Sequence, residues 1–194
     1  MTTHERIRRA FHFRQRVDNL PWSSARGNRV TLAELFRDLG YTKGVEVGTR
    51  HGDYAHVLCE KNPALALTCI DPWASYSHLS QEQQDANYTL ATTNLKPYNV
   101  TILRMPSMEG VQRFADRSLD FVYIDGNHEF DYCCPDIIYW AKKVKRGGIV
   151  AVHDYYPFGW AGVVQAVMAY THCHHIDPWY VTREREPTAF WENP

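Results

Sequence analysis

The stretch V-E-V-G-T-R-H-G-D at residues 45–53 decides the fold. It overlaps a short apolar run that predicts a buried strand over Gly44–Gly48, and it leads into a helical pattern over Asp53–Glu60. Gly48 permits a tight turn at the end of the strand, and Gly52 lets the helix approach its neighbours closely. Backbone amides at the start of such a helix can receive a carboxylate of a ligand. The stretch therefore predicts a strand–turn–helix unit with a ligand site at its turn.

The second motif, T-C-I-D-P-W at residues 68–73, lies one strand further along the chain. It follows the first by about twenty residues, the spacing at which the second strand of a βαβ unit brings an acid to ribose hydroxyls. Asp71 can accept both hydroxyl protons, and Trp73 can pack near an adenine ring. The glycine spacing is G-x-x-x-G behind Glu46 and not G-x-G-x-x-G, which argues against a dinucleotide pyrophosphate. Each motif alone is compatible with a simple turn, but together they predict a nucleoside cofactor.

Strand and helix patterns alternate along most of the chain. Short apolar strands are expected at 64–70, 100–104, 119–124 and 149–152, and helices at 31–40, 80–95, 108–114, 132–144 and 163–170. Gly147-Gly148 is expected to break the chain between the last long helix and the strand that follows it. The alternation predicts a parallel sheet with helices on both faces. Two final strands, within His174–Thr182 and Pro187–Trp191, indicate an antiparallel pair at the edge of the sheet.

The first twenty residues carry a basic helical pattern. Ile7, Ala10 and Phe11 follow helical spacing among five arginines, at positions 6, 8, 9, 14 and 16. Either this helix contacts an anionic substrate, a lipid or RNA, or it is a solvated helix that packs Ile7 and Phe11 on the edge of the domain. Charge runs are usually solvated faces, which favours the second interpretation. The lead-in at residues 21–43 is expected to be helical, with a capping-box pattern at Thr31 and Glu34.

Composition excludes several classes of protein. The chain has 194 residues, of which 44% are hydrophobic, and a net charge of −1. The length and the hydrophobic content suit one α/β domain over residues 1–194. The balanced charge gives no overall electrostatic attraction to nucleic acid or to anionic membranes. The five cysteines are an odd number without metal-pair spacing, which favours reduced thiols. No apolar stretch reaches the roughly eighteen residues that span a bilayer, and the N-terminus has no signal-peptide core. We therefore expect a soluble cytoplasmic protein, with the N-terminal helix as a candidate element of a homodimer.

Two acids end neighbouring strands of the predicted sheet. Asp125 and Asp154 follow the strands at 119–124 and 149–152, so their Cα atoms are expected about 5 Å apart at the carboxyl edge, where ligands bind. Carboxylates this close repel one another unless they share a proton or a cation such as Mg²⁺ or Ca²⁺, which would also lower the pKa of a substrate hydroxyl. Alternatively, Asp125 binds cofactor or substrate directly and Asp154 caps the next helix. His128 and His153 titrate near neutral pH and are candidate bases.

These motifs resemble those of the class I S-adenosylmethionine-dependent methyltransferases, in which an E-x-G-x-x-x-G turn holds the methionine part of the cofactor. The resemblance covers about residues 40–194. It implies a Rossmann-like three-layer αβα core over residues 44–194, with a mostly parallel seven-stranded sheet of order 3-2-1-4-5-7-6 and an antiparallel last strand. The residues that it implies for binding S-adenosylmethionine are Glu46, Gly48, Thr49, Gly52, Asp71, Pro72, Trp73, Ser107, Met108 and Asp125.

A narrower resemblance comes from I-D-G-N-H at residues 124–128 and G-G-I-V-A-V-H-D at residues 147–154. Both are similar to motifs of a branch that includes macrocin-type sugar O-methyltransferases, where corresponding acids are metal ligands. This resemblance implies metal ligation by Asp125 and Asp154. His153 stands where some relatives have another acid. Asp125, His128 and His153 form the candidate catalytic set.

The expected reaction is methyl transfer to an oxygen of a hydroxylated small molecule such as a sugar. Nucleic-acid base methyltransferases of this fold carry an N/D-P-P-Y/F run after the fourth strand, which D-G-N-H at residues 125–128 does not match. Tyr155, Tyr156, Phe158 and Trp160 follow the fifth strand and are expected to form an aromatic wall for the acceptor. Three alternatives stay open: a cofactor-binding module or partner subunit without transferase activity, an aminopropyl transferase, and an RNA-binding protein.

Overall fold

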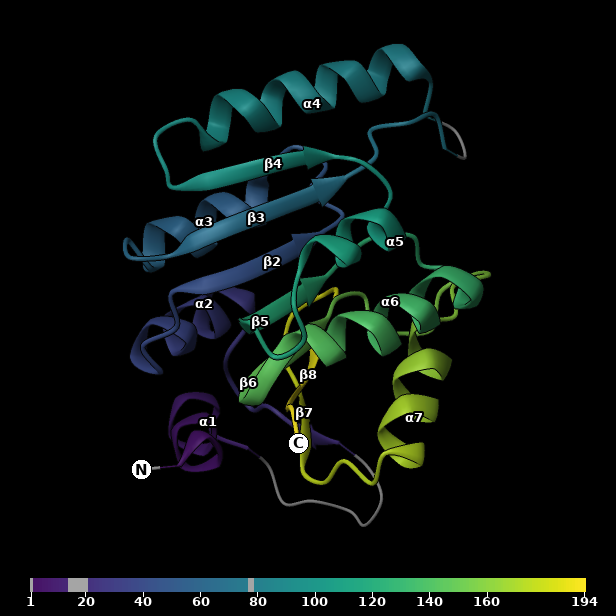
Figure 1. The fold of residues 1–194 in the computed structure, drawn as a ribbon. Helices are drawn as coiled ribbons and strands as arrows, with labels where there is room; N and C mark the ends of the chain where they lie inside the picture. The colour runs from purple at the N-terminus through teal and green to yellow at the C-terminus, as the bar shows by residue number, and fades with distance from the viewer. Residues whose placement is uncertain (1, 14–20, 77–78) are drawn as a thin grey trace.

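The computed structural model of the protein describes residues 2–13, 21–76 and 79–194. Its centre is an eight-stranded sheet of order β1-β7-β8-β6-β5-β2-β3-β4 (Figure 1). Five adjacent strands are parallel: β2 (Lys43–Val47), β3 (Ala66–Asp71), β4 (Val100–Arg104), β5 (Leu119–Ile124) and β6 (Val144–Val152). On the other side of β6, β8 (Ala189–Glu192) runs antiparallel to both β6 and β7 (Trp179–Val181).

The order of the strands confirms the expected one. From β4 to β7 the sheet follows the predicted order 3-2-1-4-5-7-6, and its last strand in sequence is antiparallel. The predicted number of strands was one too few, because β1 (Trp22–Ser23) pairs with the outer side of β7. A strand of two residues is too short to show an alternating pattern, so this part of the lead-in at 21–43 gave no strand signal.

Helices cover both faces of the sheet. α2 (Arg29–Asp38) and α3 (Asp53–Lys61) pack on one face, with α1 (Thr3–Phe11) beside α2 and α4 (Gln81–Leu95) toward the β4 edge (Figure 1). α6 (Phe130–Lys143) and α7 (Val163–Cys173) cover the other face, together with the short α5 (Ser107–Gly110) and the 3₁₀ turn η1 (Val111–Arg113). Within the described ranges, no helix is both long enough and apolar enough to cross a membrane.

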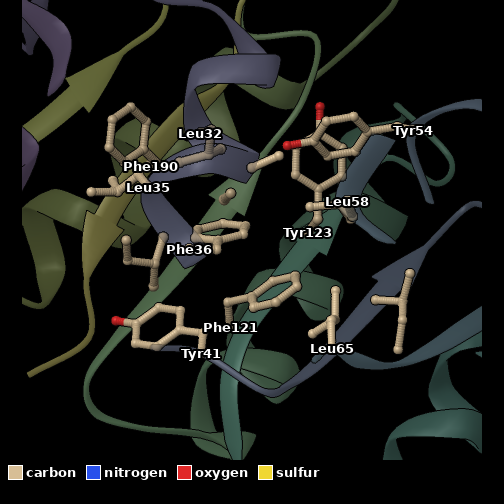
Figure 2. Packing of buried hydrophobic residues seen from close by; sticks show 14 of the residues in the cluster. Leu32, Leu35, Phe36, Tyr41, Tyr54, Leu58, Leu65, Phe121, Tyr123 and Phe190 are labelled. Atoms are coloured by element: carbon tan, nitrogen blue, oxygen red, sulfur yellow. The ribbon is translucent and has the colours of Figure 1, made fainter. Parts of the chain in front are cut away.

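Alternation along the strands divides the core into two clusters. On β5, Phe121 and Tyr123 face α2 and α3, whereas the alternate residues face α6; these are Leu119, Val122 and Ile124. Phe121 stacks on Phe36 of α2 with 4.1 Å between ring centres, and Tyr123 meets Tyr54 of α3 at 4.2 Å (Figure 2). These buried aromatic pairs hold α2 and α3 against the strands whose ends carry the site.

The N-terminal helix is part of the core. Ile7 and Phe11 of α1 are fully buried, which confirms the interpretation of a helix that packs on the edge of the domain. Arg8 lies over the ring of Trp22, 5.6 Å from its centre. The described helix ends at Phe11, and the part of the predicted basic helix at residues 14–20, including Arg14 and Arg16, lies outside the described residues.

Two predicted boundaries were wrong. α2 begins at Arg29, because Asn28 is the N-cap and forms the capping box with Thr31, so Thr31 and Glu34 do not form one. β6 begins at Val144, which places Gly147-Gly148 inside the strand and not before it. An irregularity in the β5–β6 pairing absorbs the extra residues of β6, and a bulge of this kind has no periodic signal in the sequence.

Candidate active site

The ends of three parallel strands meet at one point of the carboxyl edge. Ile124 of β5 pairs with Val47 of β2 on one side and with Val152 of β6 on the other. The chain stays in register one residue further, since the Asp125 N–H donates to the Val47 carbonyl (2.8 Å) and the His153 N–H donates to the Ile124 carbonyl (2.9 Å). Asp125 and His153 are therefore held side by side by backbone hydrogen bonds.

Two carboxylates and two imidazoles converge at this point, and we call Asp125, His128, His153 and Asp154 the acid–imidazole cluster. Nε2 of His128 lies 2.9 Å from Asp154 Oδ2 and 3.6 Å from Asp125 Oδ1. Nδ1 of His153 lies 3.3 Å from Asp125 Oδ1 and 3.4 Å from Asp154 Oδ2, the same two oxygens. The two imidazoles thus share one oxygen of each acid. The predicted approach of Asp125 and Asp154 is present, and both histidines take part in it.

The imidazoles and carboxylates of the cluster form ion pairs, but the ring nitrogens are not aligned for hydrogen bonds. His128 Nε2 and both ring nitrogens of His153 are buried and have no aligned hydrogen-bond partner among the described residues. Ligand atoms of Asp125, His128 and Asp154 all lie within 4.8 Å of one another. Two carboxylates and an imidazole that face one point without satisfied hydrogen bonds form a donor set that fits a divalent cation.

The cluster shifts the pKa of each member. Burial opposes ionisation of Asp125 and Asp154, but the two imidazoles outweigh it and lower the pKa of both carboxyls. Burial likewise opposes protonation of the histidines, and the two carboxylates outweigh it, raising the pKa of His128 to about 9 and that of His153 to about 10. Without an added ion, the cluster at neutral pH is a balanced set of two carboxylates and two imidazoliums.

Asp154 has an unusual backbone conformation. Its φ is +58°, in the left-handed region that costs a non-glycine residue about 1 kcal/mol or more. The turn is held by the Tyr156 N–H, which donates to the Asp154 carbonyl (2.8 Å). Asp154 does not cap the next helix, since the N-cap of α7 is Gly162. The capping alternative is therefore wrong, and the strained turn serves to aim the carboxylate into the cluster.

The glycine turn after β2 lies against the cluster. Gly48 has φ +88°, and a Cβ built on it would stand 2.0 Å from the Asp125 carbonyl oxygen. Gly52 is the N-cap of α3, with φ +82°. Glu46 and Thr49 are both buried beside this turn. Burial raises the pKa of Glu46 to about 8, and the neighbouring Thr49 hydroxyl opposes this shift in part. The turn and Asp125 are thus in backbone contact.

Asp71 joins the two predicted cofactor motifs. One of its oxygens accepts from the Arg50 N–H (2.9 Å) and the other from the Trp73 N–H (2.7 Å). The Trp73 ring is fully buried, donates to the Arg50 carbonyl (2.8 Å) and packs edge-on against Tyr88. The structure therefore corrects the expected adenine contact of Trp73: its ring holds the loop from inside, while Pro72 is exposed at the surface.

Ser107 and Met108 face different surroundings. The Ser107 hydroxyl donates to Asp136 of α6 (2.5 Å) and accepts from the Trp140 indole (2.8 Å), so it ties α5 to α6. Met108 keeps about a third of its surface exposed (36%) and is free to meet a ligand. Asp136 is buried, and burial raises its pKa to about 6. In the sequence, the signal for this residue is an acid at position 136 among apolar neighbours.

Arg29 is a second residue near the site that sequence reasoning missed. Its Nε lies 3.6 Å from Glu184 Oε2, and its guanidinium stands 5.9 Å from the centre of the Tyr54 ring. The Tyr54 hydroxyl donates to the Arg29 carbonyl (2.9 Å), and the charges of Arg29 and Asp125 interact. The partners of Arg29 come from α3, from the turn before β8 and from the end of β5, so no local pattern could reveal them.

An open hollow adjoins the cluster, and we call it the aromatic hollow. It has a volume of about 640 Å³ and is lined by Tyr76, Glu129, Phe130, Asp131 and Trp160. Of the four residues expected to form an aromatic wall, Trp160 lines it; Phe158 packs edge-on against His128 at 5.6 Å and stacks on Tyr156. Tyr155 points elsewhere and packs against Trp179.

The family model described as a methyltransferase domain matches residues 45–155. Among curated proteins, the chain is 25% identical over 136 residues to an uncharacterized protein of Acanthamoeba polyphaga mimivirus, covering 67% of this chain and 58% of that protein. It is 25% identical over 115 residues to an uncharacterized protein of Sinorhizobium fredii, covering 57% of this chain and 13% of that protein. The chain therefore spans less than two thirds of the length of either.

Two solved structures show the same fold. One is the O-methyltransferase of Streptomyces achromogenes involved in tomaymycin synthesis, in complex with S-adenosylmethionine, with TM-score 0.63, 15% identity, and coverage of 86% of this chain and 79% of that one. The other is a Podospora anserina methyltransferase with bound S-adenosylhomocysteine, with TM-score 0.61, 13% identity, and coverage of 84% and 78%.

Proposed function

This chain belongs to the methyltransferase domain family, and from that premise we propose that it transfers the methyl group of S-adenosylmethionine to an oxygen of a hydroxylated small molecule such as a sugar. One observation carries the proposal: the turn at Gly48 and the acid–imidazole cluster meet at the backbone of Asp125. A cofactor held by the turn would present its methyl group beside charged groups suited to an acceptor hydroxyl. Both structural neighbours contain S-adenosylmethionine or its product, which supports the same cofactor here.

We assign the cofactor to the carboxyl ends of β2 and β3. Among the described residues, each oxygen of Asp71 accepts one hydrogen bond, so lone pairs remain for the two ribose hydroxyls. Pro72 and Met108 are exposed on the side where the adenine would lie. The turn from Gly48 to Gly52 would hold the methionine part, with the cofactor amine toward Asp125. Arg29, whose charge interacts with that of Asp125, would supply a positive charge for the methionine carboxylate.

For this reaction, the main task of the protein is to align the acceptor oxygen with the methyl group of the cofactor. The carbon–sulfur bond of the sulfonium breaks as the oxygen–carbon bond forms, S-adenosylhomocysteine is the leaving group, and the hydroxyl proton passes to water at the open edge of the site. A divalent ion such as Mg²⁺ or Ca²⁺, held by Asp125, His128 and Asp154, would lower the pKa of the acceptor hydroxyl. The two carboxylates suit Mn²⁺ as well as Mg²⁺ and Ca²⁺. His153 is nearly buried behind the two acids, and we assign it the role of orienting them.

The test is transfer of a labelled methyl group to a panel of sugars and phenols, with and without Mg²⁺ or Mn²⁺. Wild-type protein should label a hydroxylated acceptor. Asp125→Asn should lower kcat at least a hundredfold, because Asp125 contacts both histidines and would also contact the cofactor and the ion. Asp116→Asn, a surface acid paired with Lys143, is the matched control and should retain activity. A folded protein that binds the cofactor but labels no acceptor would favour a binding module without transferase activity.

A further inference from the structure

The aromatic hollow contains charge that the methyl transfer does not use. Among its described lining residues, Glu129 and Asp131 are acids and the other three are aromatic. In the described parts of the chain, neither acid has an ion-pair partner. The aromatic side chains are open to solvent, from 40% exposed for Tyr76 to 62% for Trp160. Large exposed aromatic faces beside carboxylates that have no described ion-pair partner suit a ligand with a positive charge.

The hollow is placed to receive part of the acceptor. Glu129 follows His128 of the acid–imidazole cluster directly in the chain. The Gly162 N–H donates to the His128 carbonyl (2.8 Å), and Gly162 itself lies so close to Phe130 that a Cβ would stand 2.5 Å from it. The loop that carries Trp160 is thus fixed against both the hollow and the cluster. A small molecule with its hydroxyl at Asp125 would extend into the hollow.

The walls of the hollow are held in place before any ligand arrives. Asn127 Oδ1 accepts from the Tyr76 hydroxyl (3.0 Å) and from the Glu129 N–H (2.8 Å), so one side chain joins two loops. Burial and then the Glu129 carboxylate raise the pKa of Tyr76, which places that carboxylate beside the phenol. Because these loops are already ordered, binding a ligand in the hollow costs little conformational entropy.

From these contacts we infer that the aromatic hollow binds a protonated amine, and that the methyl acceptor is a hydroxylated amine such as an amino sugar. The inference rests on the proposed function for the site of methylation. A cation gains from both the aromatic faces and the carboxylates. A neutral acceptor would leave Glu129 and Asp131 unpaired, and a phosphorylated one would be repelled by them.

The first experiment needs no turnover. It compares binding of choline, which has a cation and a hydroxyl, with that of its uncharged isostere 3,3-dimethylbutan-1-ol, observed through the indole N–H resonance of Trp160. Choline should bind about tenfold more tightly than the isostere. The double variant Glu129→Gln/Asp131→Asn should lose about tenfold in choline affinity, whereas Glu60→Gln, an exposed acid of α3, should not. Equal affinity for the isostere, no binding of choline, or unchanged affinity in the double variant would overturn the inference.

The second experiment separates this inference from the proposed function. With labelled S-adenosylmethionine, amino sugars should have a KM at least fivefold below that of their N-acetyl derivatives, and the double variant should remove the difference with kcat nearly unchanged. Methyl transfer that prefers the neutral derivatives would contradict the amine inference but agree with the proposed methyltransferase activity. A protein that binds choline in the hollow but does not bind S-adenosylmethionine would contradict the proposed function instead.

Discussion

At the scale of single residues, Asp125 and Asp154 each offer one oxygen to the same two imidazoles. This sharing means that a change in one carboxylate alters the charge around the other three groups. Two close carboxylates with a nearby imidazole also provide the donors for a divalent ion. The affinity for that ion is therefore the property that depends most directly on individual residues of the cluster.

We expect wild-type protein to bind Mn²⁺ and Asp154→Asn to bind it at least tenfold more weakly, because one of two charged ligands is lost. Titration calorimetry measures both affinities. Asp116→Asn, which changes an exposed acid on the far side of α6, should bind like wild type. Wild-type protein that does not bind Mn²⁺, Mg²⁺ or Ca²⁺ would contradict a metal role and leave the ion-paired cluster as the working form.

Arg29→Gln should weaken binding of S-adenosylhomocysteine about tenfold, because the methionine carboxylate loses a charged partner. The same change should leave 5′-methylthioadenosine binding unaltered, since that molecule has no amino-acid part. Arg37→Gln at the other end of α2 is the control. Equal losses for both nucleosides would show that Arg29 supports the fold and does not hold the carboxylate.

The sequence predicts the pair of acids in the cluster but not the pair formed by Arg29 and Glu184. Asp125 and Asp154 could be placed together because each directly follows an apolar strand, and neighbouring strands end at the same edge. Arg29 and Glu184 could not, because they are 155 positions apart and meet only once β7 and β8 fold back beside α2. Burial of Trp73 was also hidden, since an aromatic after an acid fits a ligand contact and a loop anchor equally well.

At the scale of elements, the strand-to-helix turn is the part with least freedom. Gly48 and Gly40 both have positive φ, +88° and +73°, but only Gly48 is crowded: its missing Cβ would meet the Asp125 carbonyl at 2.0 Å, whereas nothing lies within 4 Å of the one at Gly40. The pair therefore separates the cost of backbone strain from the cost of a steric clash with β5.

Gly40→Ala should lower the free energy of unfolding by about 1 kcal/mol, the cost of left-handed backbone for a residue with a side chain. Gly48→Ala should lower it by more than about 3 kcal/mol and abolish cofactor binding, because β2 and β5 must move apart. Urea unfolding gives both values. Similar values for the two variants would mean that the contact between Gly48 and Asp125 is not needed.

α6 carries a buried acid whose ionisation opposes folding. Burial raises the pKa of Asp136 from 3.8 to about 6, so the folded protein binds its proton more tightly than the unfolded chain does. The resulting cost, roughly 3 kcal/mol, is complete above pH 6 and disappears as the pH falls toward 4. Asn at this position would keep an acceptor for the Ser107 hydroxyl without the charge.

Asp136→Asn should therefore raise the free energy of unfolding by about 1–3 kcal/mol at pH 7.5 and by about half as much at pH 5. Urea unfolding at the two pH values measures the difference. Asp131→Asn, an exposed acid one turn and a residue earlier on the same helix, should change stability little at either pH. A variant that is less stable than wild type at pH 7.5 would show that the carboxylate is held by something other than Ser107.

Most elements were predictable because they repeat a pattern over many residues. β2 to β5 and the long helices were placed within a few residues, since each has several apolar positions at a fixed period. The exceptions lack such repeats. β1 has two residues, the cap of α2 depends on the single side chain of Asn28, and the extra length of β6 depends on an irregular pairing with β5.

At the scale of the whole molecule, the sheet brings the parts of the proposed site to one edge. Figure 1 shows the strand order β6-β5-β2-β3. Asp154, Asp125, the Gly48 turn and Asp71 stand, in that order, at the ends of these strands. α5, α6 and α7 cover the face opposite α2 and α3, and the aromatic hollow is lined by the first turn of α6 and by the loops before α4, α6 and α7. The fold was predictable from the alternation of strands and helices, but the neighbours of the hollow were not, because loops have no period.

The most direct measurement of the central claim is the binding of S-adenosylmethionine by titration calorimetry. Wild-type protein should bind with a dissociation constant on the order of micromolar. Asp71→Asn should weaken binding at least tenfold, because the ribose hydroxyls lose a charged acceptor, while Asp38→Asn on the far end of α2 should have no effect. If folded wild-type protein does not bind S-adenosylmethionine, the account of the cofactor site is wrong.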